Sequence, residues 1–431
     1  MSIADVLSNR APWHVECADA VAAAKMLPDD CISTICTSPP YFALRSYLEK
    51  DDPNKHLEIG LDDTPDAYAA RLVELFRELR RALHPSGTLW LNLGDSYAQT
   101  TCRNRNGFGN IASACKLAVH RIENDRSTVG GDIKPKDLIG VPWLVAFALR
   151  ADGWFLRQYM PWVVRNKMPE SADDRPSTAC ETVFLLSKCA DYHFDMEAVK
   201  RQPSLGPADT RTHDGVRGAF PKSQIPGQSP QNSRCGVYES RNFRSADLWF
   251  DSVGMLLAGH LDGSDDGTIL GLDVSTQSYR GSHFAVWPQR LVANFIAAGS
   301  SERGVCPHCS APHVRVVKKQ RVATRPGCDS KVGVIRKSVI AAGGTNATSI
   351  LTGNRDPERH VTRTETVGWE PSCECPPHDP LPSIIYDPFT GSGTTGKVAL
   401  DMNRRFLGSE LNADYMKLIS ARMRSAKPSL F

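Results

Sequence analysis

A strand–turn–helix segment near the C-terminus constrains the fold most. Ile384–Tyr386 is a short apolar run, the turn Asp387–Thr395 (DPFTGSGTT) follows it, and a helix is expected over Lys397–Met402. Glycines in such a turn allow a ligand to approach the backbone at a helix N-terminus. A second strand, Arg405–Ser409, leads to Glu410, about 20 residues after the glycines, where nucleotide-binding βαβ units place a ribose-binding carboxylate. The segment therefore predicts a nucleotide-type site in an α/β sheet.

Two other interpretations of this turn stay open. Gly391 to Lys397 also fits the start of a phosphate-binding loop, G-x-x-x-x-G-K. The next residue is Val398, however, where that loop requires a Ser or Thr to bind Mg²⁺. The turn is also compatible with a glycine turn that binds nothing.

The N-terminal part shows the same alternation of helices and strands. Apolar residues at helical spacing (Leu72, Leu75, Phe76, Leu79) predict a helix over 66–83 that stops at the His84–Gly87 turn. The remaining expected elements are helices at 19–26, 138–151 and 289–298 and strands at 31–36, 88–93, 155–164 and 182–187. Such alternation predicts an α/β fold with a mostly parallel sheet.

The turn Thr37–Tyr41 (TSPPY) follows a strand, at the sheet edge where open α/β folds place their sites. The two prolines, Pro39 and Pro40, fix the backbone and remove two N–H donors. The Ser38 hydroxyl and the Pro39 carbonyl can then accept hydrogen bonds from the amino group of a base. Tyr41 offers a ring on which an extruded base can stack. An ordinary proline turn is the alternative.

Together, Thr37–Tyr41 and Asp387–Thr395 resemble the two motifs of the DNA amino-methyltransferases, in the group whose catalytic motif precedes its cofactor motif. The likeness covers most of the chain and is that of a phage or bacterial site-specific DNA methylase. Three further segments resemble the family: Leu89–Tyr97, Lys134–Pro142 and His283–Pro288.

The resemblance implies a Rossmann-like methyltransferase sheet, assembled from both ends of the chain, that binds S-adenosylmethionine. Glu410 would bind the ribose, and Asp19 would contact the adenine end, although Ala18 replaces the usual glycine before it. The residues implied to bind the cofactor are Asp19, Thr37, His283, Phe284, Asp387, Pro388, Phe389, Gly391, Ser392, Gly393, Thr394 and Glu410. The implied catalytic residues are Ser38, Pro39, Pro40 and Tyr41.

The identity of the methylated base is a finer question. Carbon-5 cytosine enzymes use a cysteine nucleophile in a Pro-Cys pair, which this sequence lacks. Within the resembled family, a leading Ser such as Ser38 favours N4 of cytosine, whereas a leading Asp is typical of N6 of adenine. We therefore expect a cytosine-N4 enzyme, with an adenine-N6 enzyme as the alternative. An RNA methyltransferase and a catalytically silent DNA-binding module are further alternatives.

Two cysteine pairs, Cys306–Cys309 and Cys373–Cys375, bracket an irregular basic segment. Four thiolates at these spacings could hold one structural zinc ion, as in a zinc ribbon, and free surface cysteines are the alternative. Similar pairs precede the cofactor motif in some phage-type members of the resembled family. A zinc deaminase is excluded, because Val305 stands where its signature needs Pro before the first Cys.

A region rich in Arg, Gly, Pro and Ser is expected to read the DNA sequence, with a solvated linker as the alternative. Its basic residues are Arg201, Arg211, Arg217, Lys222, Arg234, Arg241 and Arg244. We accordingly expect a catalytic half at 1–200 with a mobile basic loop at 99–131, a target-recognition region at 201–282, and a cofactor-binding half at 283–431 with a cysteine-rich insertion at 300–380.

Net charge and composition say less about the fold and function of the chain than these motifs do. The net charge of +3 says little about partners, and no apolar run is as long as the roughly 18 residues of a membrane span. The first ten residues lack the pattern of a secretion signal. The lack of a secretion signal and of a membrane span predicts a cytoplasmic protein. The resemblance implies a bacterial or phage origin and double-stranded DNA as the substrate, with a homodimer and a cognate restriction endonuclease as further expected partners.

Overall fold

A computed structural model of the chain describes residues 1–98, 133–164, 174–199, 255–258, 268–273, 287–323 and 360–427, apart from residues 45, 135, 176, 177 and 179. The chain divides into two units. The first comprises residues 1–200, 245–315 and 369–431, and contains the sheet and both expected sites. The second comprises residues 201–244 and 316–368, of which the structure describes parts of two strands.

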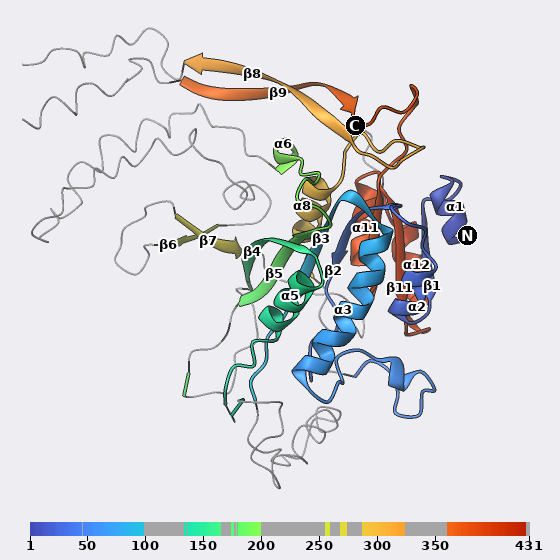
Figure 1. Cartoon of the computed structure of the whole chain (residues 1–431), viewed down its shortest axis with the longest axis vertical. Coiled ribbons are helices and arrows are strands. Elements are labelled where there is room, and N and C mark those ends of the chain that lie inside the picture. The colour runs from blue at the N-terminus through green and yellow to red at the C-terminus, as the bar shows by residue number, and fades with distance from the viewer. Residues whose placement is uncertain are drawn as a thin grey trace, which may run out of the picture. The chain divides into compact units, whose positions relative to one another are not determined.

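The first unit contains a nine-stranded sheet in the order β1-β11-β10-β2-β3-β5-β4-β7-β6 (Figure 1). Its strands are β1 (Trp13–Cys17), β2 (Ile32–Thr37), β3 (Leu83–Leu93), β4 (Phe155–Val163), β5 (Cys180–Ser187), β6 (Met255–Ala258), β7 (Thr268–Asp273), β10 (Ile384–Asp387) and β11 (Arg405–Glu410). The helices are α1 (Ile3–Leu7), α2 (Ala20–Lys25), η1 (Lys55–Leu57, a 3₁₀ turn), α3 (Pro65–Ala82), α5 (Val141–Ala151), α6 (Met196–Val199), α8 (Gln289–Gly299), α11 (Thr394–Asp401) and α12 (Tyr415–Arg424).

Strands from the two ends of the chain lie side by side at the centre of this sheet. β10 pairs in parallel with both β11 and β2, and β2 pairs in parallel with β3. Because parallel strands end at the same edge, Thr37 and Asp387 are brought together although 350 residues separate them. The expected assembly of the sheet from both ends of the chain is therefore confirmed. β5 pairs antiparallel with β3 and β4, so the sheet is mixed.

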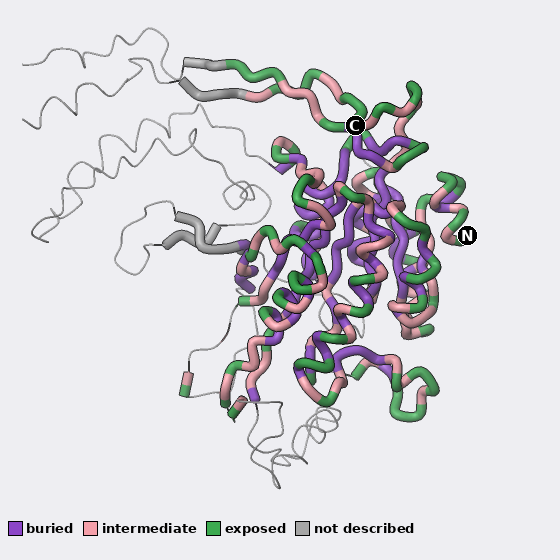
Figure 2. The backbone as a smooth tube through the Cα atoms, viewed as in Figure 1, coloured by how far each residue is buried: buried purple, intermediate pink, exposed green. Residues whose placement is uncertain are grey.

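Helices cover both faces of the sheet, because strands such as β3 carry apolar side chains on both faces. Its residues Leu89, Leu91 and Leu93 join the core formed with α2, α3 and α5. Trp90, between them, points to the other face and stacks on Phe295 of α8 at 4.8 Å between ring centres. Figure 2 shows that the buried residues concentrate in these central strands and in the helix faces against them. The α/β, Rossmann-like fold class is thus confirmed.

Three local expectations differ from the structure. The expected turn at His84–Gly87 lies inside β3, which begins directly after α3 and shifts register against β2 between Ile32 and Thr34. The insertion expected to be irregular contains two long paired strands, β8 (His313–Ala323) and β9 (His360–Pro371). Backbone pairing here needs no apolar sequence pattern, which is why periodicity missed it. β6 and β7, from the expected recognition region, extend the main sheet.

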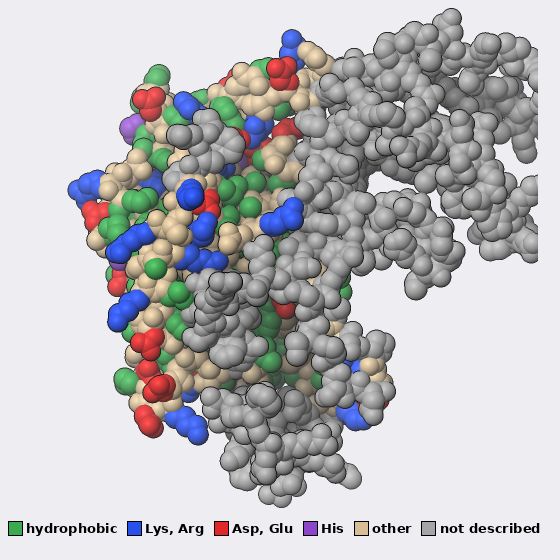
Figure 3. Space-filling view, turned by 180° about the vertical axis from the view of Figure 1, so that it is seen from behind, with side chains coloured by type: hydrophobic (Ala, Val, Ile, Leu, Met, Phe, Trp, Pro, Cys, Tyr) green, Lys and Arg blue, Asp and Glu red, His purple; other side chains and the backbone are tan. Residues whose placement is uncertain are grey.

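In the described part of the chain, no helix is both long and apolar enough to cross a membrane. On the face drawn in Figure 3, acidic and basic side chains are interspersed over the described surface.

Candidate functional site

The turn between β10 and α11 has the backbone geometry that its glycines predict. Gly391 and Gly393 both have positive φ, +53° and +82°, which side chains other than glycine rarely adopt. Gly393 caps α11, which starts at Thr394, three residues before the expected start. Backbone N–H groups of the turn therefore lie at a helix N-terminus, where they can bind polar ligand atoms.

Asp387 connects this turn to the catalytic turn. It is almost fully buried, and its carboxylate accepts hydrogen bonds from Thr37 Oγ1 at 2.7 Å, Thr395 Oγ1 at 2.6 Å and the Phe389 N–H at 3.0 Å. Burial raises the pKa of Asp387 to about 6 although these three donors favour the charged form. The carboxylate therefore joins the end of β2, the glycine turn and α11 at one point.

Glu410, at the end of β11, binds the backbone of the glycine turn between β10 and α11. Its Oε2 accepts a hydrogen bond from the Gly391 N–H at 2.8 Å, and its Oε1 accepts one from the Asn412 N–H at 2.9 Å. Burial raises the pKa of Glu410 to about 7, against the lowering effect of the Asn412 and Gly391 N–H groups. A small change of environment can thus move this carboxyl between its neutral and charged forms near neutral pH.

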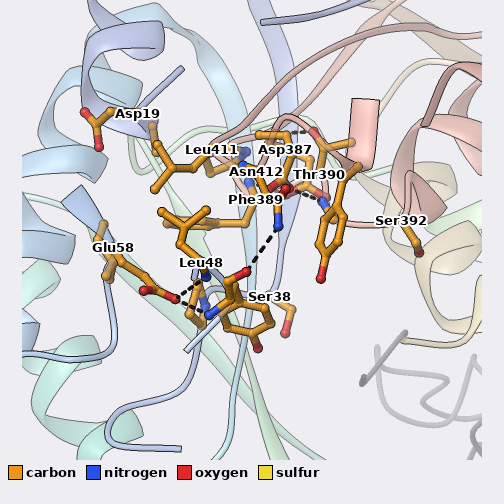
Figure 4. A pocket seen from close by; sticks show the side chains of 18 of the residues that line it. Asp19, Ser38, Leu48, Glu58, Asp387, Phe389, Thr390, Ser392, Leu411 and Asn412 are labelled. Atoms are coloured by element: carbon orange, nitrogen blue, oxygen red, sulfur yellow. Dashed lines mark hydrogen bonds between the residues drawn. The ribbon is translucent and has the colours of Figure 1, made fainter. Parts of the chain in front are cut away.

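A pocket lies at this edge of the sheet, and Figure 4 shows Asp19, Ser38, Glu58 and Ser392 around it. Ten of the residues expected to act in catalysis or cofactor binding line it: Asp19, Ser38, Pro40, Asp387, Pro388, Phe389, Gly391, Ser392, Thr394 and Glu410. The lining combines carboxylates with the apolar side chains of Leu48, Ile59 and Trp287. This composition fits a ligand that carries a positive charge, hydroxyl groups and an aromatic ring.

Four expected site residues do not line this pocket. Thr37 is fully buried and uses its hydroxyl to bind Asp387, and Gly393 packs beside Met423 of α12. Pro39 is buried, and the Tyr41 ring lies against the backbone of Gly94. His283, Phe284, the loop at 99–131 and the seven basic residues expected to contact DNA lie outside the described residues.

The catalytic turn is held by a hydrogen-bond network that the sequence did not predict. The Tyr41 hydroxyl donates to Glu181 Oε2 at 2.5 Å. Asn92 Nδ2 lies 2.8 Å from the Tyr41 hydroxyl, 3.2 Å from Ser38 Oγ and 3.2 Å from Glu181 Oε2. Burial, and then the Glu181 carboxylate, raise the pKa of Tyr41 well above its ordinary value, so the phenol stays a neutral donor. Strands β3 and β5 thus fix the orientation of the turn.

Sequence reasoning also missed Glu58, which lines the pocket although only 5% of it is exposed. Its carboxylate accepts from the backbone N–H of Tyr47 and forms an ion pair with Lys55 at 2.7 Å. Glu181 was detectable as a single charge inside the apolar run Cys180–Ser187. Glu58 gives no such signal, because it lies in a polar loop.

The four cysteines expected to bind metal come together. The Sγ atoms of Cys306, Cys309, Cys373 and Cys375 all lie within 4.8 Å of one another, so the cluster could hold a metal ion. None of the four lines the pocket described above.

A family model described as DNA methylase, for methylation at N6 or N4, matches residues 32–306 and 379–421, which is most of the chain. The chain belongs to this DNA methylase family. It is therefore a DNA methyltransferase that acts on an exocyclic amino group. The cofactor that the sequence resemblance implies is S-adenosylmethionine. The phosphate-binding-loop alternative does not hold, and the residue at its decisive position, Val398, is buried.

Known relatives match either nearly the whole methylase or a part of it. The Type II methyltransferase M.SmaI of Serratia marcescens is 28% identical over 418 residues, covering 96% of this chain and 92% of that protein. The Type II methyltransferase M.Cfr9I of Citrobacter freundii is 40% identical over 188 residues, covering 44% of this chain and 58% of that protein. Among solved structures, the cytosine-N4-specific PvuII DNA methyltransferase aligns with 97% of this chain and 89% of its own at 12% identity, with a TM-score of 0.46.

The raised pKa of Glu410 predicts that cofactor binding depends on pH. If the charged carboxylate accepts hydrogen bonds from ribose hydroxyls, affinity is highest above pH 7 and falls as Glu410 becomes protonated. We expect the dissociation constant to rise about tenfold between pH 8 and pH 6, as titration near pH 7 requires. Isothermal titration of S-adenosylmethionine at several pH values measures this. Glu410→Gln should bind weakly with a flat profile, and an equal slope in that variant would contradict the assignment.

Proposed function

We propose that this methylase transfers the methyl group to N4 of cytosine in duplex DNA. The observation that carries the proposal is the position of Ser38, a neutral hydroxyl that lines the pocket at the first place of the Ser-Pro-Pro-Tyr turn. A hydroxyl can accept one hydrogen bond and donate another, whereas a carboxylate only accepts. Ser38 can therefore serve both the amino group of cytosine and its neighbouring ring nitrogen.

The residues of the site would have the following roles in cofactor binding and methyl transfer. S-adenosylmethionine supplies the methyl group when bound, and Asp19, Phe389 and Glu410 would hold it in the pocket. The target base leaves the duplex and enters beside Ser38, where the hydroxyl and the Pro39 carbonyl accept hydrogen bonds from its amino group. These contacts aim the nitrogen lone pair at the methyl carbon. The Asn92–Tyr41–Glu181 network supports the proposal, because it holds the turn in one orientation.

The basic residues between Arg201 and Arg244 would contact DNA in this scheme, through phosphates and base edges. Their role stays a prediction, since they lie outside the described residues. The expected homodimer and cognate endonuclease stay predictions as well.

Nucleoside analysis of methylated DNA tests the choice of base. Duplex DNA is incubated with the protein and labelled S-adenosylmethionine, digested to nucleosides and separated by chromatography. We expect label only in N4-methylcytosine. Label in N6-methyladenine would overturn the choice of base while leaving the reaction class unchanged. Duplex RNA of the same sequence serves as a control and should stay unlabelled.

A further inference from the structure

A second site lies outside the cofactor pocket, where the chain enters β8 and leaves β9. Cys306 and Cys309 precede β8, and Cys373 and Cys375 follow β9. The four Sγ atoms come from segments more than sixty residues apart in sequence, yet they all lie within 4.8 Å of one another. Sulfur ligands of a tetrahedral zinc ion, with Zn–S bonds of about 2.3 Å, are about 3.8 Å apart, so a small adjustment suffices to bind the ion.

The backbone around Cys306 supports its sulfur as a metal ligand. The His308 N–H donates to Cys306 Sγ at 3.4 Å, and the Ser310 N–H donates to the Cys306 carbonyl at 2.9 Å. Ser310 has a positive φ of +61°, which turns the chain sharply after Cys309. N–H donors directed at a thiolate stabilise its charge, and such outer contacts orient the ligands of metal sites.

Two histidines near the cluster, His378 and His313, are better placed beside the ligands than among them. His378 Nδ1 lies 2.7 Å from the Pro376 carbonyl and 3.8 Å from Cys306 Sγ. Because a carbonyl only accepts, Nδ1 carries the proton and donates it to Pro376, which leaves this nitrogen without a lone pair for a metal ion. His378 Nε2 lies 3.3 Å from His313 Nε2, so that nitrogen also has a partner. The donor set is therefore four sulfurs, which favours zinc over a hard cation such as Mg²⁺.

We propose that these four cysteines bind one structural zinc ion that fastens the start of β8 to the end of β9. The other contacts at this place are mainly hydrogen bonds of the backbone and of serine hydroxyls. Val305 and Leu381 exchange two backbone hydrogen bonds, of 2.7 and 2.9 Å, and Ser372 donates to the Pro312 carbonyl. Among the described residues of 301–312 and 372–382, the buried apolar side chains are Val305, Cys306, Ala311 and Pro312. A segment with so little apolar contact is stabilised effectively by a metal ion.

Metal analysis of the purified full-length chain tests the proposal. After expression and dialysis against metal-free buffer, mass spectrometry of the metal content should find one zinc ion per chain. The double variant Cys309→Ser/Cys375→Ser should retain less than about a tenth of that zinc. The control Cys17→Ser/Cys189→Ser replaces one exposed and one half-buried cysteine elsewhere and should keep the full amount. Cobalt(II) added to metal-depleted protein should produce the absorption of a tetrahedral thiolate site.

Limited proteolysis then tests the fastening role. Removal of zinc should speed cleavage between residues 301 and 382 at least several-fold while the rate of cleavage elsewhere in the first unit stays unchanged. Wild-type protein without zinc, or a double variant that keeps it, would overturn the metal site. Unchanged cleavage after zinc loss would overturn its fastening role. None of these readouts requires methyl transfer, so the result stands apart from the choice of base.

Discussion

Asp387→Ala is expected to lower the free energy of unfolding by about 3 kcal/mol and to reduce methyl transfer at least a hundredfold. The substitution leaves the hydroxyls of Thr37 and Thr395 and the N–H of Phe389 without their acceptor inside the sheet. It also separates the catalytic turn from the glycine turn, whose relative position sets the distance between base and methyl group. Urea unfolding and a labelled methyl-transfer assay measure the two effects.

Asp387→Asn separates the loss of charge from the loss of the acceptor. Asparagine keeps one oxygen for the Thr37 hydroxyl and removes a carboxylate whose burial raises its pKa to about 6. We expect it to cost less stability than alanine, about 1 kcal/mol, while still reducing activity. Asp191→Ala, in an exposed bend after β5, is the control and should change neither quantity. A loss of less than about 0.5 kcal/mol in Asp387→Ala would contradict the linking role.

Much of the sheet could be predicted from the sequence because its signals are local. Within a few residues, the glycine turn at Asp387–Thr395 and the apolar runs on either side of it predict a strand, a turn and a helix. Helix α3 shows its buried face through Leu72, Leu75, Phe76 and Leu79, all fully buried. The cysteine pairs likewise predicted a cluster that the fold brings together.

The parts that could not be predicted depend on contacts between distant residues. Glu181 and Asn92 reach Tyr41 from two different strands, and their side chains take on a role only when β5 pairs with β3. The hydrogen bond from the Thr37 hydroxyl to Asp387 likewise joins residues far apart in sequence, so no local pattern predicts it. The sequence did not predict the pairing of β8 with β9, because neither strand has a continuous apolar pattern.

Ser38→Ala is expected to reduce the rate of methyl transfer about a hundredfold, because it removes a preorganised hydrogen-bond partner of the base amino group. The fold should tolerate the change. Asn92 Nδ2 loses one acceptor but keeps the Tyr41 hydroxyl at 2.8 Å and the Glu181 carboxylate at 3.2 Å. Stability should therefore fall by less than about 1 kcal/mol. The cofactor residues Asp387 and Glu410 are untouched, so S-adenosylmethionine should bind as in the wild type.

The central claim is that the turn at Thr37–Tyr41 presents the base to the methyl group bound in the pocket. Single-turnover transfer of labelled methyl to duplex DNA, with cofactor affinity measured on the same samples, tests it most directly. Ser8→Ala, in an exposed turn after α1, is the control. The account predicts a large loss of rate at unchanged cofactor affinity in Ser38→Ala and none in Ser8→Ala. A wild-type rate in Ser38→Ala would contradict it.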